Sequence, residues 1–138
     1  MARGVIGLVT GKTPAPLYEE LVYLYREEGL SFKNVSVFVL NEYLGLNQEE
    51  PQSSHSFMQR TFFDHVDIPD GNIHFLRGDV PPSMAADHCQ AYETKITEVG
   101  GIDLQILGIG RNGHIGYNEP ETPMDSRTAQ VELAETTL

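Results

Sequence analysis

The sequence has one cysteine, few basic residues and no long apolar run. Cys89 is the single cysteine, so no disulfide can form within the chain, and this favours a reducing compartment. Nine Lys and Arg against 20 Asp and Glu give a net charge of -11, which disfavours nucleic acid and anionic membranes as partners. No apolar run approaches membrane-spanning length, and residues 1–4 begin no secretory signal. We therefore expect a cytoplasmic protein that binds neither nucleic acid nor membrane.

The residues that are present suit a folded protein with one core. The chain has 138 residues, of which 40% are apolar, and residues 1–138 are expected to form a single domain. Short apolar runs alternate with helical patterns, which predicts a three-layer α/β fold with a mainly parallel sheet. We expect parallel strands near residues 4–9, 35–40 and 103–108, and shorter ones at 73–76 and 131–134.

Three segments have helical spacing of apolar residues. The first follows Pro14, with leucines at helical intervals, and is expected to end at Gly29. The second covers residues 54–66 and carries aromatic core residues. The third follows Pro82, and Cys89 is expected to lie in its buried stripe. No metal site is expected, because the histidines of these segments have no partner at metal-ligand spacing.

A glycine-rich stretch follows the apolar run at 104–107. Residues 108–120 read G-I-G-R-N-G-H-I-G-Y-N-E-P, and they place His114 and Glu119 just beyond a predicted strand. Open α/β sheets bind ligands at the carboxyl ends of their parallel strands. From spacing alone, a ligand site and a glycine-rich turn with one surface histidine explain this stretch about equally well.

This stretch resembles the signature of the glucosamine-6-phosphate deaminase family, also called glucosamine-6-phosphate isomerases. The related 6-phosphogluconolactonases share its G-x-G-x-x-G-H core, but the N-E-P ending favours the deaminases. Residues 126–128, Ser-Arg-Thr, also agree with the family. The resemblance implies a Rossmann-like fold. It also implies a sugar phosphate, glucosamine 6-phosphate, as substrate, which is converted to fructose 6-phosphate and ammonia without a cofactor or metal.

The resemblance also assigns residues to this chemistry. Thr10, Gly11, Lys12 and Thr13 are similar to the family's T-G-G-T-P loop, which binds the substrate phosphate, and Lys12 replaces its second glycine. A loop between a strand and a helix can hold an anion with backbone N–H groups. Lysine adopts a positive φ less readily than glycine, yet it adds a cation, and the sequence does not decide between these effects.

The resemblance implies that four further residues serve catalysis. His114 is implied to open the sugar ring, oriented by Glu119. Asn112 stands where the family often has Asp, and its amide can still orient the imidazole. Asn41 stands in a stretch similar to the family's D-E-Y-x-G-L, at the position of the Asp that moves a proton between two sugar carbons. An amide cannot accept that proton at neutral pH.

Family enzymes are longer than this chain, with a strand and helix before residue 5 and further units after residue 128. We therefore expect this chain to represent the middle of the fold, truncated at both ends. Exposed sheet edges then favour pairing with another chain, including a homo-oligomer. Two alternative functions stay open: a catalytically inactive homologue that binds a sugar phosphate, and a phosphogluconolactonase-like hydrolase that depends on His114.

Overall fold

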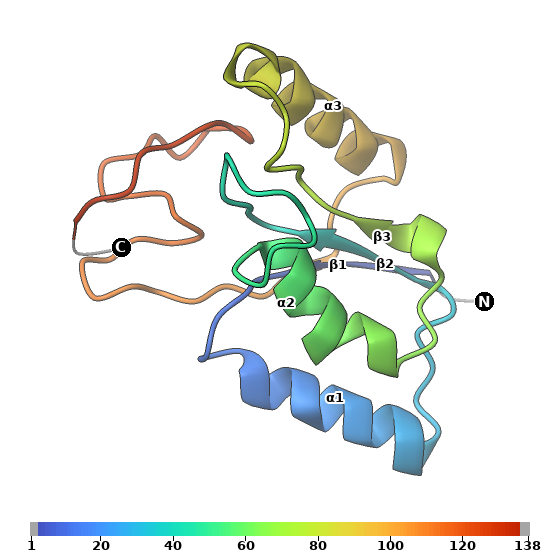
Figure 1. Ribbon diagram of the computed structural model, residues 1–138. Coiled ribbons are helices and arrows are strands. Elements are labelled where there is room, and N and C mark those ends of the chain that lie inside the picture. The colour runs from blue at the N-terminus through green and yellow to red at the C-terminus, as the bar shows by residue number, and fades with distance from the viewer. Residues whose placement is uncertain (1–2, 136–138) are drawn as a thin grey trace.

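The computed structural model describes residues 3–135 as a parallel sheet with helices on both faces (Figure 1). The strands are β1 (Gly4–Leu8), β2 (Val35–Val39), β3 (Ile73–His74) and β4 (Leu104–Gln105). Their spatial order is β3-β2-β1-β4, and every neighbouring pair is parallel. The predicted three-layer α/β fold is confirmed.

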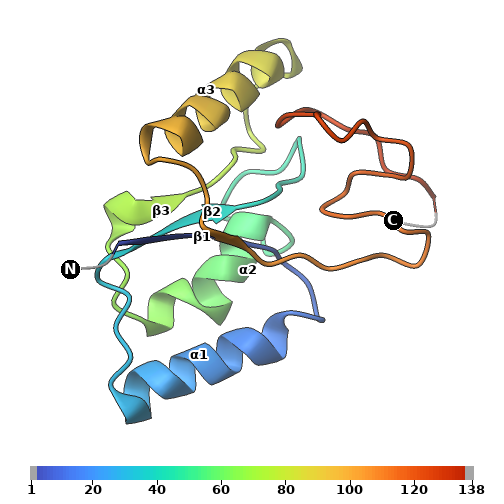
Figure 2. The same cartoon turned by 180° about the vertical axis from the view of Figure 1, so that it is seen from behind.

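The helices divide between the two faces of the sheet. Helices α1 (Ala15–Glu28) and α2 (Ser54–Thr61) lie on one face, and α3 (Ala85–Glu98) lies on the other (Figures 1 and 2). As predicted, α1 ends at Gly29, which has a φ of 77°. Short 3-10 turns occupy residues 63–65, 70–72 and 82–84.

The core follows from the alternation of side chains along β2. Val37 and Val39 are fully buried under α1 and α2, whereas Phe38 points to the opposite face and packs on Tyr92 of α3. The larger cluster comprises Leu8, Tyr18, Phe32, Val37, Val39, Met58, Phe62, Phe63 and Ile68. Both faces of the central strands are therefore covered, as a parallel sheet requires.

Three expectations about elements are wrong. The helix predicted over 54–66 stops at Thr61, because Phe62 and Phe63 both enter the core and the chain must leave the regular helix to place two consecutive rings there. Residues 131–134 form no strand. Cys89 is half-buried beside a cavity, since Tyr92 occupies the deep position on α3 and donates a hydrogen bond to the Val39 carbonyl at 2.5 Å.

The strand predicted at 103–108 is also shorter and less buried than expected. β4 contains only two residues, and it lies at the edge of the described sheet. Leu104 and Leu107 are 59% and 52% exposed. The apolar sequence is that of an interior strand, but in the described chain only β1 covers it.

Candidate active site

A cleft of about 250 Å³ lies at the carboxyl edge of the sheet, between the loops that follow β1 and β4. The chain leaves β1 toward β2 on one side, whereas β4 pairs on the other side of β1. Loops diverge at such a reversal of strand order and leave a crevice for ligands. The cleft is lined by the predicted phosphate loop, by Asn41 and by His114. Tertiary structure thus brings together residues that are about 100 positions apart in the sequence.

Behind the cleft, Asn112 joins His114 to Glu119. The Asn112 side-chain oxygen accepts hydrogen bonds from His114 Nδ1 at 2.7 Å and from the His114 backbone N–H at 3.1 Å. The Asn112 amide nitrogen donates to Glu119 Oε2 at 2.7 Å. These contacts fix the amide orientation, because a carboxylate can only accept and a backbone N–H can only donate.

The tautomer of His114 follows from this arrangement. Since the Asn112 oxygen is an acceptor, Nδ1 carries the proton in the neutral ring and Nε2 is the proton-accepting nitrogen. Glu119 acts on the imidazole through Asn112, and its other oxygen accepts from the Ala134 backbone N–H at 3.0 Å. The carboxylate therefore also holds the last described segment against the signature loop.

Two neighbours set the position of the His114 ring. Gly110 lies directly against the imidazole, so a Cβ at that position would overlap the ring. The Tyr117 ring stacks alongside His114 with 6.4 Å between centroids. Close packing against the imidazole therefore explains why position 110 of the signature is glycine. Gly110 needs no direct part in the chemistry.

Asn41 lies just beyond the end of β2 and reaches the cleft. It is half-buried, and its side-chain oxygen accepts from Ser54 Oγ at a long 3.5 Å. Asn41 also lines a larger cavity of about 380 Å³ that adjoins the cleft below α3. The structure therefore places an amide, at the cleft, where the family resemblance implies a carboxylate.

The neighbouring Glu42 points away from the cleft to the start of α2. Its Oε1 accepts from the backbone N–H groups of Tyr43 at 2.8 Å and Ser54 at 2.9 Å, and its Oε2 accepts from that of His55 at 3.0 Å. A carboxylate at a helix N-terminus satisfies unpaired N–H groups and interacts favourably with the helix dipole. The Glu42 carboxylate therefore binds backbone N–H groups and points away from the cleft. In this position it cannot replace a carboxylate at position 41.

We predict that Glu42→Gln lowers the free energy of unfolding by about 1–3 kcal/mol, since the charged hydrogen bonds at α2 are lost. Urea denaturation followed by circular dichroism measures this change. Glu49→Gln is the matched control, because Glu49 is exposed and bonds only within its own loop in the described structure. Equal stability of the two variants would contradict the assigned role of Glu42.

The predicted phosphate loop, residues 10–13, is anchored at its base by Tyr18 of α1. The buried Tyr18 hydroxyl donates to the Val9 carbonyl and accepts from the Val9 N–H. Burial raises the pKa of Tyr18 to about 12, although its hydrogen bond to Val9 acts in the opposite direction. The hydroxyl therefore stays protonated over the physiological range and fixes the point where β1 turns into the loop.

The backbone of the loop answers one part of the question about Lys12, which is whether the lysine is strained. Among residues 3–135, the non-glycine residues with positive φ are Tyr117 and Glu121, so Lys12 carries no such strain. Gly11 provides the turn instead, with a φ of 123°. Proline at positions 14 and 16 removes two N–H groups from the start of α1, so an anion here would depend on the loop amides of Gly11, Lys12 and Thr13.

Tyr43 and Tyr117 form part of the site that sequence analysis missed. Their hydroxyls are 2.5 Å apart, and their rings lie 5.5 Å apart between centroids. Burial and the bond to Tyr43 raise the pKa of Tyr117. The pair connects the loop after β2, which carries Asn41, to the signature loop, which carries His114. Only the unusual φ of 64° at Tyr117 marks this residue, and that is not visible in sequence.

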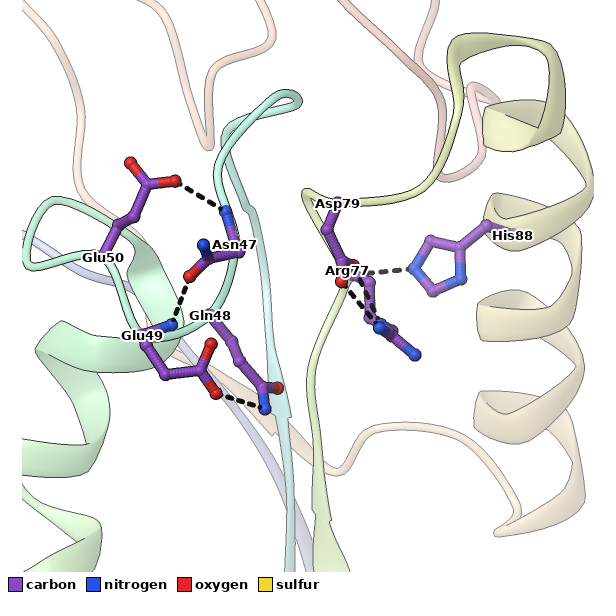
Figure 3. A network of polar contacts seen from close by, with 7 residues as sticks. All are labelled: Asn47, Gln48, Glu49, Glu50, Arg77, Asp79 and His88. Atoms are coloured by element: carbon purple, nitrogen blue, oxygen red, sulfur yellow. Dashed lines mark hydrogen bonds and ion pairs between the residues drawn. The ribbon is translucent and has the colours of Figure 1, made fainter.

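Polar contacts hold Arg77 and His88 in the wall of the larger cavity, and others close a turn nearby (Figure 3). The Arg77 side chain makes a bidentate pair with Asp79 at 2.9 and 2.7 Å, and the Arg77 backbone N–H donates to His88 Nε2 at 2.8 Å. Burial and nearby cations lower the pKa of His88, so this histidine is a neutral acceptor. Figure 3 also shows Asn47 and Glu50 closing the neighbouring turn at 3.1 Å.

The segment after the signature loop contacts α3. Glu121 has a φ of 77°, which glycine would adopt without strain. Thr128 donates to Glu93 of α3 through its backbone N–H at 2.8 Å and through its hydroxyl at 2.7 Å. In the part of the chain that is described, no three His, Cys, Asp or Glu side chains gather in a way that could hold a metal. No helix there is long and apolar enough to cross a membrane.

The fold and site define a class of protein. The sheet is parallel, its strand order reverses beside a cleft, and the loops after β1 and β4 line that cleft. This is the architecture of the doubly wound α/β proteins, which bind ligands at such a topological switch point. The chain belongs to the family of glucosamine-6-phosphate isomerases and 6-phosphogluconolactonases, whose family model matches residues 2–131. The resemblance inferred from the signature stretch is confirmed.

Individual relatives show the same relationship. A glucosamine-6-phosphate deaminase of Oceanobacillus iheyensis is 50% identical over 135 residues, which are 98% of this chain and 53% of that protein. The solved structure of a monomeric glucosamine-6-phosphate deaminase superimposes with a TM-score of 0.93 at 41% identity, over 98% of this chain and 55% of that one. A 6-phosphogluconolactonase of Thermotoga maritima gives 0.69 at 28% identity, over 82% of this chain and 49% of that one. The chain thus spans about half the length of the curated relatives it matches.

Proposed function

We propose that this chain provides the glucosamine 6-phosphate site of a glucosamine-6-phosphate deaminase. The observation that carries the proposal is the cleft at the switch point, which is lined by Thr10–Thr13, Asn41 and His114. The phosphate would lie against the loop amides and near Lys12, which offsets locally the net charge of -11. The sugar would then extend toward His114. The deaminase names of the relatives support this choice of substrate.

His114 has the geometry of a group that opens the sugar ring. Its Nε2 can take the proton from the hydroxyl on C1 and return a proton to the ring oxygen, which breaks the bond between C1 and that oxygen. The Nδ1–H bond to Asn112 holds the ring in the tautomer that this step requires. Proton exchange leaves the imidazole unchanged at the end of the step, so no metal or redox cofactor enters it.

The next step moves a proton from C2 to C1 and yields an imine, which water hydrolyses to fructose 6-phosphate and ammonia. Removal of a proton from carbon needs a positioned base. Asn41 reaches the cleft but cannot accept this proton. Glu42 is engaged with the start of α2. We therefore propose that this chain binds the substrate and opens its ring, but isomerises it slowly.

One alternative function follows from the same observation. A catalytically inactive homologue that only binds a sugar phosphate would use the same cleft and the same loop at residues 10–13, and the amide at position 41 fits this alternative. Calorimetric titration with glucosamine 6-phosphate, combined with an assay of ammonia release, separates the two. Binding with release supports the deaminase, and binding without release supports the inactive homologue. Absence of binding would contradict both. The remaining alternative, a lactonase-like hydrolase, is tested by incubating the chain with 6-phosphogluconolactone and measuring its hydrolysis.

Thr13 lines the cleft, and its hydroxyl can donate to the phosphate in addition to the loop amides. We predict that Thr13→Ala, which removes this hydroxyl, weakens the binding of glucosamine 6-phosphate by about 1–2 kcal/mol, roughly one hydrogen bond to a charged group. This corresponds to a rise in Kd of about 5- to 30-fold in the calorimetric titration. Thr94→Ala is the matched control, because the Thr94 hydroxyl donates to the Gln90 carbonyl on α3, away from the cleft lining. Unchanged affinity in Thr13→Ala would remove this loop from the proposed phosphate site.

A further inference from the structure

Asn112 of the signature loop is the only asparagine in the sequence that is followed by glycine. The backbone nitrogen of the residue after an asparagine can attack the side-chain carboxamide, and a side chain on that residue hinders the approach. Gly113 has no side chain, so the attack is least hindered at Asn112. The residues that follow the other asparagines are Val35, Glu42, Gln48, Ile73 and Glu119.

The pair lies in an exposed turn. This turn is closed by a backbone hydrogen bond from the Gly113 N–H to the Gly110 carbonyl at 2.9 Å. Both Asn112 and Gly113 are exposed, so water reaches them. A hydrogen bond in an exposed turn opens at little cost in free energy, because few buried contacts oppose the opening. Opening releases the Gly113 nitrogen and gives the backbone the freedom that attack on the carboxamide requires.

The contacts of the Asn112 side chain favour this attack. Its oxygen accepts from the His114 backbone N–H at 3.1 Å and from His114 Nδ1 at 2.7 Å. Donors held against a carbonyl oxygen stabilise the negative charge that develops there when a nucleophile adds to the carbon. The amide nitrogen, which is the leaving group, points the other way, to Glu119 Oε2 at 2.7 Å. The signature loop therefore holds the carboxamide with its carbonyl polarised.

We propose that Asn112 is a site of spontaneous deamidation, with the Gly113 nitrogen as nucleophile and water as the only co-reactant. The Gly113 nitrogen bonds to Asn112 Cγ and the bond from Cγ to Nδ2 breaks, so a cyclic imide forms. The proton of the Gly113 N–H leaves with Nδ2 as ammonia. Water then opens the imide at one of its two carbonyl carbons, which yields aspartate or isoaspartate. Each conversion consumes one water and releases one ammonia per chain.

Conversion changes the connection between His114 and Glu119. An ionised aspartate has no proton to donate, so the hydrogen bond from position 112 to Glu119 Oε2 is lost. Isoaspartate also inserts a methylene into the main chain ahead of His114. Deamidation itself is independent of the proposed function, whereas its effect on the opening of the sugar ring rests on that function.

The test incubates the folded chain of 138 residues in mildly alkaline buffer without substrate and follows its asparagines by peptide mapping with mass spectrometry. Asn47 is the internal control. It is exposed and its side-chain oxygen accepts from the Glu49 backbone N–H at 2.9 Å, but glutamine follows it. Asn112 should convert faster than Asn47 by about tenfold or more, because glycine leaves the attacking nitrogen unhindered.

Two variants assign the released ammonia to its source. Asn112→Gln keeps the carboxamide but lengthens the side chain by a methylene, which disfavours closure of the imide, so ammonia release should largely disappear. Asn47→Gln should release ammonia at the parent rate, and circular dichroism checks that both variants are folded. Because no glucosamine 6-phosphate is present, deaminase activity cannot contribute. The proposal is overturned if Asn112 converts no faster than Asn47, or if Asn112→Gln releases as much ammonia as the parent chain.

Discussion

Replacing His114 by glutamine is expected to abolish turnover of glucosamine 6-phosphate. Glutamine is similar in length and keeps a hydrogen-bonding group, but it cannot exchange a proton at neutral pH. A positioned acid–base group contributes on the order of 10²–10⁴-fold, so the rate of ammonia release should fall by about that factor. The binding of substrate should change much less, because the phosphate loop is untouched.

The measurement is best made in an Asn41→Asp background, in a chimaera with the unmatched part of the Oceanobacillus iheyensis deaminase, so that the parent rate is high enough to fall. His88→Gln is the matched control. His88 accepts a hydrogen bond from the Arg77 backbone, and it lines the larger cavity and not the cleft. If the His114 and His88 variants turned over substrate equally fast, the catalytic assignment of His114 would be wrong.

The opposite effect is expected at the end of β2. Asn41→Asp should raise the formation of fructose 6-phosphate by on the order of 10²–10⁴-fold, because a carboxylate there can take the proton from C2 and return it to C1. The substitution changes neither size nor position, and Asn41 already reaches the cleft. The assay is fructose 6-phosphate formation by the same chimaera with Asn or with Asp at position 41.

A second asparagine provides the control for added charge. Asn118→Asp places the same negative charge in the signature loop, beside the larger cavity, where no proton transfer from the sugar is expected. Only the change at position 41 should then raise the rate. An unaltered chain that is already as fast as deaminases of this family would show that another residue is the base.

Local sequence was sufficient to predict most of the fold. The runs at 5–9 and 35–40 are apolar and flanked by loops, and they form β1 and β2. A strand that is buried on both faces of a parallel sheet is recognised from such a short apolar run. Gly29 ends α1 for a local reason as well, since glycine adopts its φ of 77° without strain. The helix at 54–66 was predicted too long, because the competition between helix propensity and the burial of two consecutive phenylalanines is decided by the core.

By itself the sequence determined the family, the signature loop and the identities of the residues around the cleft, because these depend on residue type and local order. Tertiary structure alone decided which contacts these residues make. It separated Asn41 from Glu42, because the Glu42 carboxylate accepts from two N–H groups at the start of α2 and from that of Tyr43. It inserted Asn112 between His114 and Glu119, and it joined Tyr43 to Tyr117. It also left β4 at an edge, although its residues are those of an interior strand. Each of these outcomes depends on contacts between distant segments, which local propensity does not encode.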